Sequence, residues 1–145
     1  MKTVADIIEK NGGLMGLFKL VSLTLRNPEG AVLEIKSLGP GPNYMDAVSV
    51  VLYEERTEKN VRAPEFNFEI DGEGRWLPFY YGNDFTGEEF FVYTINRHLL
   101  VINLELRRYL SRRAGELNLR LEALGFPRAG EDMRYYPLFP LTGSE

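Results

Sequence analysis

The hydrophobic pattern of this chain begins with a helical period and changes to a strand period near residue 21. Thr3 and Asp6 have the spacing of a capping box, with Asp in place of Glu, and predict a short helix over residues 3–10. The apolar run at 14–20 fits either a further helical turn or the lead-in to a strand, because a short apolar run cannot be assigned by its period. From Val21 apolar and polar residues alternate, which predicts the first strand of a sheet.

The middle of the chain has the pattern of an antiparallel sheet. Residues 47–54 are apolar at positions that face both sides of a sheet, as a central strand requires. Pro78 cannot donate to a strand ladder, so its strand is predicted to be an edge strand or to carry a bulge. The predicted strands are 21–26, 31–38, 47–54, 66–70, 76–81 and 90–95.

A helical period returns towards the C-terminus. Asn103 is placed to cap a helix, and Gly125, Phe126 and Pro127 supply a helix stop. One apolar stripe runs between them, formed by Leu106, Leu110, Ala114, Leu117, Leu121 and Leu124. These patterns predict a single α+β domain over residues 1–126. Its sheet is mainly antiparallel with five or six strands, a short helix precedes it, and a long C-terminal helix packs on one face.

Residues 127–145 form an apolar tail beyond that helix. Its prolines disfavour a helix or a central strand, so the tail is predicted to lie extended in a groove. The groove belongs either to the tail's own domain or to a second copy, and the second arrangement would make a homodimer by exchange of tails. The large apolar side chains of the tail are Tyr135, Tyr136, Leu138, Phe139 and Leu141.

The composition is that of a folded protein. Hydrophobic residues make up 44% of the chain and charged residues 26%, both ordinary for a globular domain. The net charge of −4 creates no general field that would attract nucleic acid. The absence of cysteine excludes disulfides, thiolate metal sites and thiol catalysis. No window approaches the roughly 18 apolar residues of a membrane span, so we expect a cytoplasmic protein with no membrane contact.

Isolated polar residues are present, but no catalytic constellation is apparent. His98 is the only histidine, and no serine lies near it in the sequence, although triad members meet in space rather than in sequence. Glu65 and Glu69 are separated by about 13 Å along a strand, on its side away from the phenylalanines, which predicts solvated charges. Asp84 lies in a turn, where capping of its own backbone is favoured over contact with a ligand or metal. We predict no catalytic residue, metal or cofactor.

The C-terminal helix is the first candidate surface for a partner. Its arginines point to different sides when they are projected at about 100° per residue. Glu116 is spaced to pair with Arg112 and Arg120, which favours an ion-paired face over a nucleic-acid surface. The arginines are Arg107, Arg108, Arg112, Arg113 and Arg120.

The aromatic part of the sheet is the second candidate surface. Strict alternation places Trp76 and Tyr80 together on one face of their strand. The other face then carries Leu77, Phe79 and Tyr81. One set covers the core, and the other forms either a second core or an exposed patch that anchors a partner or stacks on bases.

Four segments of the chain resemble a bacterial domain family of unknown function. They are residues 49–55, 63–71, 74–81 and 83–87. Members of this family are small proteins often encoded on plasmids, phages and integrated elements. The resemblance spans residues 17–125 and implies a fold and a genomic setting, but no functional residue. Where the family pattern has Tyr-Tyr-Glu-Gln, this chain has Leu52-Tyr53-Glu54-Glu55.

We therefore expect a non-catalytic binding module that binds a protein partner or a second copy of itself, as an accessory protein of a bacterial mobile element. One alternative is a nucleic-acid-binding protein that uses the arginine-bearing helix or the sheet aromatics. Another is a small enzyme centred on Asp84 and His98. The residues predicted to bind a partner are Trp76, Tyr80, Tyr81, Asn83, Asp84, Tyr135, Tyr136 and Phe139.

Overall fold

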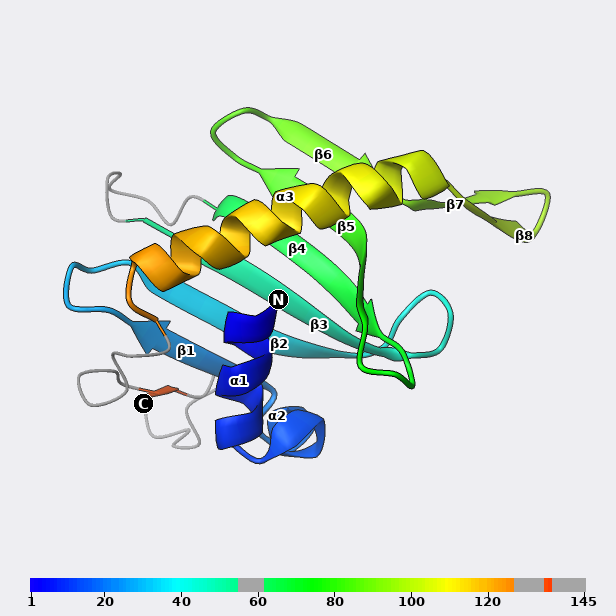
Figure 1. Ribbon diagram of the computed structural model, residues 1–145. Helices are drawn as coiled ribbons and strands as arrows, with labels where there is room; N and C mark the ends of the chain where they lie inside the picture. Colours follow the sequence, from blue (N-terminus) through cyan, green and yellow to red (C-terminus); the bar gives the residue numbers. More distant parts are fainter. Residues whose placement is uncertain (55–61, 127–134, 137–145) are drawn as a thin grey trace, which may run out of the picture.

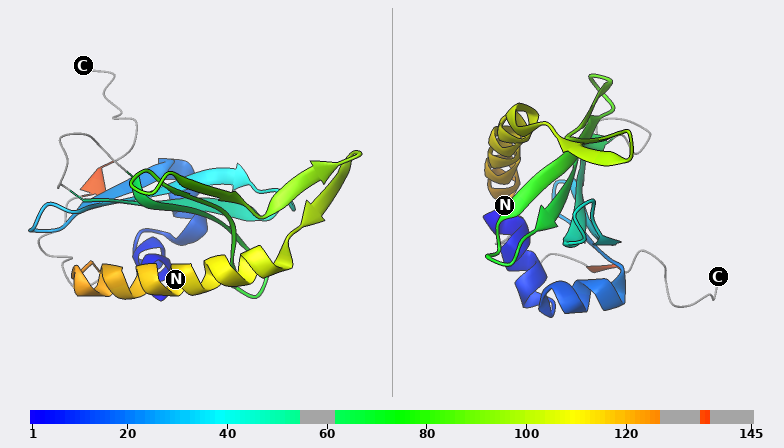
Figure 2. Two further views of the ribbon diagram at one scale, coloured as in Figure 1. Left: turned by 90° about the horizontal axis from the view of Figure 1, so that it is seen from above. Right: turned by 90° about the vertical axis from the view of Figure 1, so that its right-hand side faces the viewer.

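The computed structural model describes residues 1–54, 62–126 and 135–136. Its elements form two layers, a twisted sheet and the helices that lie across one face of it (Figure 1, Figure 2). Within the described residues the helices are α1 (Lys2–Lys10), α2 (Gly13–Leu20) and α3 (Leu104–Ala123). The strands are β1 (Ser22–Arg26), β2 (Val32–Pro40), β3 (Asp46–Tyr53), β4 (Arg62–Ile70), β5 (Trp76–Asn83), β6 (Glu88–Phe91), β7 (Tyr93–Asn96), β8 (Leu99–Ile102) and β9 (Tyr135–Tyr136).

The main sheet has the strand order β6-β5-β4-β3-β2-β1-β9, and each neighbouring pair is antiparallel. The central strand is β3, and residues 47–52 within it are buried, as their apolar pattern predicts. The long helix α3 crosses the face that carries the core (Figure 2). The predicted fold class, an α+β domain with a C-terminal helix on one face of an antiparallel sheet, is confirmed.

The N-terminal helix is capped differently from the prediction. Thr3 lies inside α1, and Met1 occupies the N-cap position without a side-chain hydrogen bond. The backbone N–H of Thr3 donates instead to Oδ1 of Asn118 in α3 at 2.9 Å. A side chain from another element can satisfy a free N–H of a first helical turn as well as a local cap can. Residues 14–20, which the sequence left open, belong to the helix α2 (Gly13–Leu20).

The long helix begins and ends as its sequence predicts. Oδ1 of Asn103 accepts a hydrogen bond from the backbone N–H of Leu106 at 3.0 Å. At the other end Gly125 has φ +80°, in the left-handed region that glycine tolerates best. The apolar stripe faces the sheet, and its fully buried members are Leu110, Ala114, Leu117 and Leu121.

The strand that contains Pro78 is an inner strand with a bulge, one of the two arrangements that the proline predicted. Asn67 pairs with Tyr80 while the next residue, Phe68, pairs with Pro78, so Phe79 is an extra residue on β5. An extra residue reverses the alternation of side chains on either side of it. The predicted division of the aromatic residues between two faces is therefore wrong. Trp76 lies on Phe68 and Tyr81 lies on Phe66, on the same face as each other.

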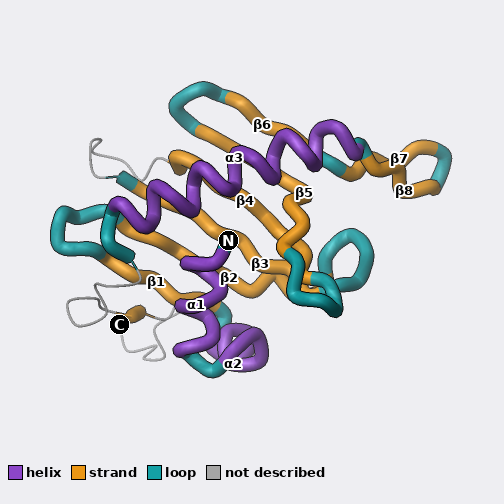
Figure 3. Tube along the Cα trace, viewed as in Figure 1, coloured by secondary structure: helices purple, strands orange, loops and turns teal. Residues whose placement is uncertain are grey.

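The predicted strand 90–95 is two strands in different sheets. β6 ends at Phe91 and β7 begins at Tyr93. Between them Val92 is fully buried, and its N–H donates to the carbonyl of Phe79 at 3.0 Å. β7 pairs with β8, a strand that the sequence did not predict, and the two form a separate sheet that stands apart from the main one (Figure 3).

Two residues of the predicted tail are described, and they form β9. Thr24 pairs with Tyr136 and Leu25 with Tyr135, which adds a short strand at the β1 edge. Phe139 and the remainder of 127–145 lie outside the described residues, so docking of the tail stays a prediction. Among the described helices none is long and apolar enough to cross a membrane.

Candidate functional site

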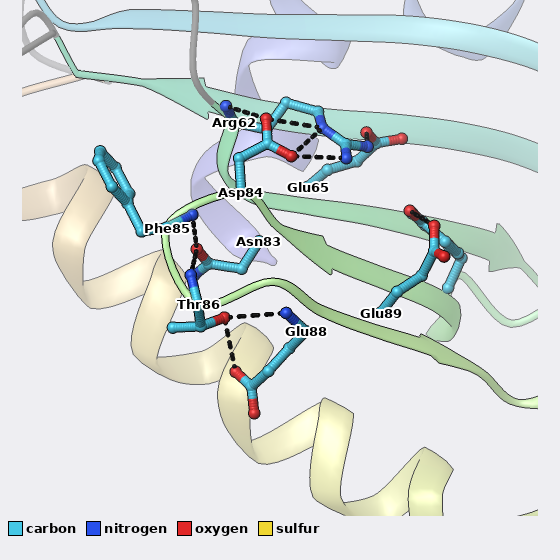
Figure 4. A network of polar contacts seen from close by, with 9 residues as sticks. Arg62, Glu65, Asn83, Asp84, Phe85, Thr86, Glu88 and Glu89 are labelled. Carbon is cyan, nitrogen blue, oxygen red and sulfur yellow. Dashed lines mark hydrogen bonds and ion pairs between the residues drawn. The ribbon is translucent and has the colours of Figure 1, made fainter.

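The turn between β5 and β6 contains predicted binding residues, and a polar clamp holds it to β4 (Figure 4). The guanidinium of Arg62 donates to Asp84 Oδ1 at 2.8 Å and to Glu65 Oε1 at 2.7 Å. The backbone N–H of Arg62 donates to the same Asp84 carboxylate at 2.9 Å. Hydrogen bonds from Arg62 lower the pKa of Asp84, and the same bonds raise the pKa of Arg62. Each charge of this clamp has a partner, so the clamp offers no unpaired charge to a ligand.

The turn itself is capped by Asn83 and not by Asp84. Oδ1 of Asn83 accepts from the backbone N–H groups of Phe85, at 2.9 Å, and Thr86, at 3.3 Å. The role predicted for Asp84 within its own turn is therefore wrong. Its carboxylate reaches a neighbouring strand because the sheet places Arg62 beside the turn, and an arginine fork is a stronger donor than a local amide.

Tyr80 lies on the face of the sheet away from the helices. Its hydroxyl donates to Glu89 Oε2 at 2.7 Å, and its ring packs on Phe91 with centroids 5.1 Å apart. The phenol pKa is raised, first by burial and then by the hydrogen bond to Glu89. Tyr80 is thus a largely buried residue that already has a hydrogen-bond partner.

Tyr81 belongs to an arginine–tyrosine cluster under α3. Its hydroxyl accepts from Arg113 at 2.8 Å and from Nδ2 of Asn83 at 3.1 Å. The guanidinium carbon of Arg113 lies 5.0 Å from the centroid of the Tyr81 ring and 5.5 Å from that of Tyr109. Because Tyr81 is 1% exposed, the cluster joins helix to sheet and presents almost none of this ring to a partner.

A cleft of about 180 Å³ lies between α3 and the adjacent ends of the strands. Ligand pockets are usually about 300–1,000 Å³, so this cleft is small for an organic ligand. Its charged groups are paired: Arg120 pairs with Glu54 across the cleft, and Arg113 pairs with Glu116 along α3 at 3.8 Å. The cleft therefore combines a small volume with a neutralised lining.

The helix arginines of α3 differ in their surroundings. Glu116 pairs with Arg113, so its predicted pairing with Arg112 and Arg120 is wrong. Arg107 stacks over the ring of Tyr93 with 5.4 Å to its centroid, and Arg113 and Arg120 are also directed to the sheet. Within the described residues only Arg108 and Arg112 of this helix lack an ion pair or ring contact, which leaves a small cationic area.

Glu69 is buried, which corrects the prediction of a solvated charge. Its side chain is 0% exposed, and Oε2 accepts from the backbone N–H of Asn43 at 2.7 Å while Oε1 accepts from the Tyr93 hydroxyl at 3.3 Å. The loop between β2 and β3 folds over this carboxylate. Gly41 allows that approach, since a Cβ there would lie 2.5 Å from Glu69. Tyr93 also accepts from Arg107, so the network joins four elements at the root of β7.

The predicted binding residues do not gather on one exposed surface. Trp76 packs edge-on against Phe68 at 5.3 Å and is partly buried in the core cluster. The β5–β6 turn, with Asp84, and the β7–β8 turn, with His98, lie at opposite ends of the molecule (Figure 1, Figure 2). Across the residues that the structure describes, no group of three or more His, Asp or Glu could hold a metal ion. The binding roles of Trp76, Tyr80, Tyr81, Asn83, Asp84, Tyr135, Tyr136 and Phe139 stay predictions.

A run of exposed apolar side chains that the sequence did not reveal lies in the β7–β8 hairpin, which we call the arm (residues 93–102). It projects from the body beyond the start of α3 (Figure 1, Figure 2). Ile95 is 78% exposed and Leu99 69%, and no other aliphatic side chain of the arm is less than 40% exposed. The aliphatic residues are Ile95, Leu99, Leu100, Val101 and Ile102.

One face of the arm is wholly apolar or aromatic. Residues opposite each other in a hairpin share a face, and Tyr93 lies opposite Ile102 while Ile95 lies opposite Leu100. The other face alternates Thr94 and Asn96 with Val101 and Leu99. The run 99–102 was the available signal for β8, but its turn lacks the Asn-Gly or Asp-Gly pattern by which hairpins are recognised. Arg97 and His98 take the positive φ values, +50° and +68°, that such a turn needs.

Fold and surface together define an α+β domain with helices on one face of an antiparallel sheet and an apolar hairpin that extends from it. Residues 2–126 match the family described as Domain of unknown function (DUF6908), and the chain belongs to this family. This match confirms the part of the resemblance that assigned the chain to a domain family of unknown function. Comparisons with curated proteins and with solved structures found no match.

Proposed function

We propose that this protein is a non-catalytic binding module that recognises another protein through the arm. The observation that carries the proposal is the uncharged face formed by Ile95, Leu100 and Ile102 on a hairpin outside the main sheet. An isolated two-stranded hairpin is marginally stable in water. With Leu104 beside it, the arm carries six aliphatic side chains that are each at least 40% exposed, and exposed apolar clusters mark interaction sites.

The root of the arm favours binding because it is fixed before any partner arrives. Val92 is buried where the two sheets meet, and its carbonyl accepts from the Asn103 N–H at 2.8 Å. Tyr93 is held by Glu69 and Arg107. A binding element that is already positioned loses less conformational entropy when it binds.

The two alternative functions have weaker support. A nucleic-acid site would rely on Arg108 and Arg112, in a chain of net charge −4. An enzyme centred on Asp84 and His98 would need two residues that lie at opposite ends of the fold (Figure 1). A protein partner is the alternative that an exposed, uncharged face of a hairpin fits best.

The proposed setting is the cytoplasm of a bacterium, where the protein serves as an accessory protein of a mobile element. The support for this part is the resemblance of the β3, β4 and β5 segments to proteins encoded on such elements. Neighbouring genes provide the test. A relaxase, recombinase or restriction system beside the gene is expected, whereas a metabolic operon would contradict the proposed setting.

Site-specific photo-crosslinking tests the binding role. A photoreactive phenylalanine analogue at position 95, in the full chain produced in its native cells, should form a covalent adduct with a protein that mass spectrometry identifies. The matched control is position 119, because Leu119 is 66% exposed on α3, away from the arm. Adding Leu100→Asp should abolish the adduct from position 95. Equal labelling from positions 95 and 119, or no adduct from either, would show that the arm is not a binding surface.

A further inference from the structure

A second apolar surface lies on α2 and the adjoining ends of β2 and β3. Its rim is formed by Met15, 67% exposed, and Phe18, 62% exposed. A groove of about 240 Å³ runs beside them, and Asp46 is the one charged residue among its lining residues. The apolar lining consists of Leu14, Met15, Leu17, Phe18, Ala47 and Val48.

The arm and this groove complement each other in shape and charge. The arm is a convex apolar element with Arg97 at its tip, and the groove is a concave apolar element with Asp46 beside it. The arm points away from the body in both orientations (Figure 1, Figure 2), so it does not enter the groove of its own chain. A second copy of the chain would supply each surface with its counterpart.

We infer that the partner of the arm is a second copy, in a two-fold dimer in which each arm lies in the α2 groove of the other copy. This inference rests on the proposed function. The two surfaces together carry eight large apolar side chains that are each at least 40% exposed, and a second copy would cover both sets at once. An arm-to-arm contact alone would leave Met15 and Phe18 of the groove exposed. Reciprocal exchange also closes the assembly at two copies.

Sedimentation equilibrium of the full chain is the first measurement. The parent should sediment as a dimer of the 16.6 kDa chain. Ile95→Glu in the arm and Phe18→Glu at the groove should each raise the dissociation constant at least tenfold, or about 1.4 kcal/mol. Leu119→Glu adds the same charge at a similarly exposed apolar site and should leave the constant unchanged. If circular dichroism shows that either variant is unfolded, Leu100→Glu, on the same face of the arm as Ile95, and Met15→Glu replace them.

Mixing the two variants distinguishes this dimer from other assemblies. Ile95→Glu keeps an intact groove, and Phe18→Glu keeps an intact arm. An equimolar mixture therefore retains one arm–groove contact, and a heterodimer should form in the mixture at concentrations where each variant alone is monomeric. A dimer that survives Phe18→Glu but not Ile95→Glu would overturn the inference in favour of an arm-to-arm contact, and one that survives both would place the interface elsewhere.

The outcomes for this inference and for the proposed function are separable. A parent chain that is monomeric at all concentrations would overturn the dimer, while a crosslink from position 95 to a different protein would still support the binding role. A dimer with intact arm–groove contacts and a position 95 crosslink only to the chain itself would support both. A monomer without any crosslink would refute both.

Discussion

Two consecutive hairpins of this chain have similar composition, but one is part of the main sheet and the other stands outside it. The β5–β6 hairpin and the arm are separated only by Val92, and both are rich in aromatic or aliphatic residues. The first lies beside β4 in the main sheet, and Tyr81 within it is almost fully buried. The second pairs with no other strand among the described residues, and each of its aliphatic side chains is exposed.

The difference shows that burial depends on available neighbours more than on hydrophobicity. The β5–β6 hairpin has β4 on its other side, α3 across its face, and an Arg62–Asp84 clamp at its turn. The arm leaves the sheet at Val92, where the chain changes direction, and no other described strand pairs with it. An apolar strand outside its sheet has no neighbouring surface of its own chain to cover its side chains. Exposed apolar elements of this kind often mark interfaces.

The largest expected effect is in the buried hairpin. Tyr81→Ala should lower the free energy of unfolding by about 3–5 kcal/mol, as for other large aromatic residues in a core. The ring contacts Phe66 at 5.0 Å and its hydroxyl accepts from Arg113, so both contacts are lost. Urea unfolding measures the change, with Tyr44→Ala, at an exposed tyrosine, as the control. A loss below about 1 kcal/mol would show that this hairpin depends no more on burial than the arm does.

A smaller effect is expected where the body holds the root of the arm. Glu69→Gln keeps the shape of the side chain but replaces one carboxylate oxygen, a hydrogen-bond acceptor, with an NH₂ group that faces other donors. The free energy of unfolding should fall by about 1–3 kcal/mol. The affected bonds are those from the Asn43 N–H and the Tyr93 hydroxyl. Urea unfolding again measures the change in the free energy of unfolding. The control Glu73→Gln, at an exposed turn, should leave that free energy unchanged. Equal effects of the two substitutions would contradict the structural role of Glu69.

The clamp on the buried hairpin predicts a pH dependence. Arg62 lowers the pKa of Asp84. The ionised Asp84 carboxylate therefore stabilises the fold fully above the ordinary Asp pKa of 3.8, and this stabilisation is lost as the pH falls through the lowered pKa. Asp84→Asn should therefore melt at a lower temperature than the parent at pH 7, and the two melting curves should converge in acid. Thermal unfolding followed by circular dichroism measures this. A difference that stays constant into strong acid would show that the carboxylate charge is not responsible.

The smallest effect is expected in the arm. Ile95→Ala should change the free energy of unfolding by no more than about 0.5 kcal/mol at protein concentrations where the chain is monomeric, because an exposed side chain loses little when it is shortened. Backbone amides of the arm should exchange with deuterium faster than those of β4. A loss above about 1 kcal/mol in the monomer, or slow exchange in the arm, would mean that the arm is covered by its own chain.

Several features were predictable because their causes are local in the sequence. Pro78 lacks an N–H, so its strand needs either an edge position or a bulge beside it, and the bulge is what an inner strand such as β5 requires. The cap at Asn103 and the stop at Gly125 depend on atoms within one turn of the helix. The apolar residues 47–52 are buried on both faces because a strand that is apolar on both sides fits only the middle of a sheet.

The candidate site was less predictable, since no single residue of the arm is unusual. The run 99–102 is apolar, and apolar runs are normally buried. The run 99–102 is exposed because the chain leaves the main sheet at Val92. Trp76 and Tyr81, which strict alternation would place on opposite faces, lie on the same face towards the core because the bulge at Phe79 reverses the alternation between them.

By itself the sequence determined the α+β class, the central strand, the bulge and both ends of the long helix, because each depends on the chemistry of neighbouring residues. Only the tertiary structure decided that Glu69 is covered by the β2–β3 loop, that Asp84 binds Arg62 and that the arm stands free. The physical reason is that a period of two fixes which side chains share a face, whereas the segments that arrive against that face come from distant parts of the chain.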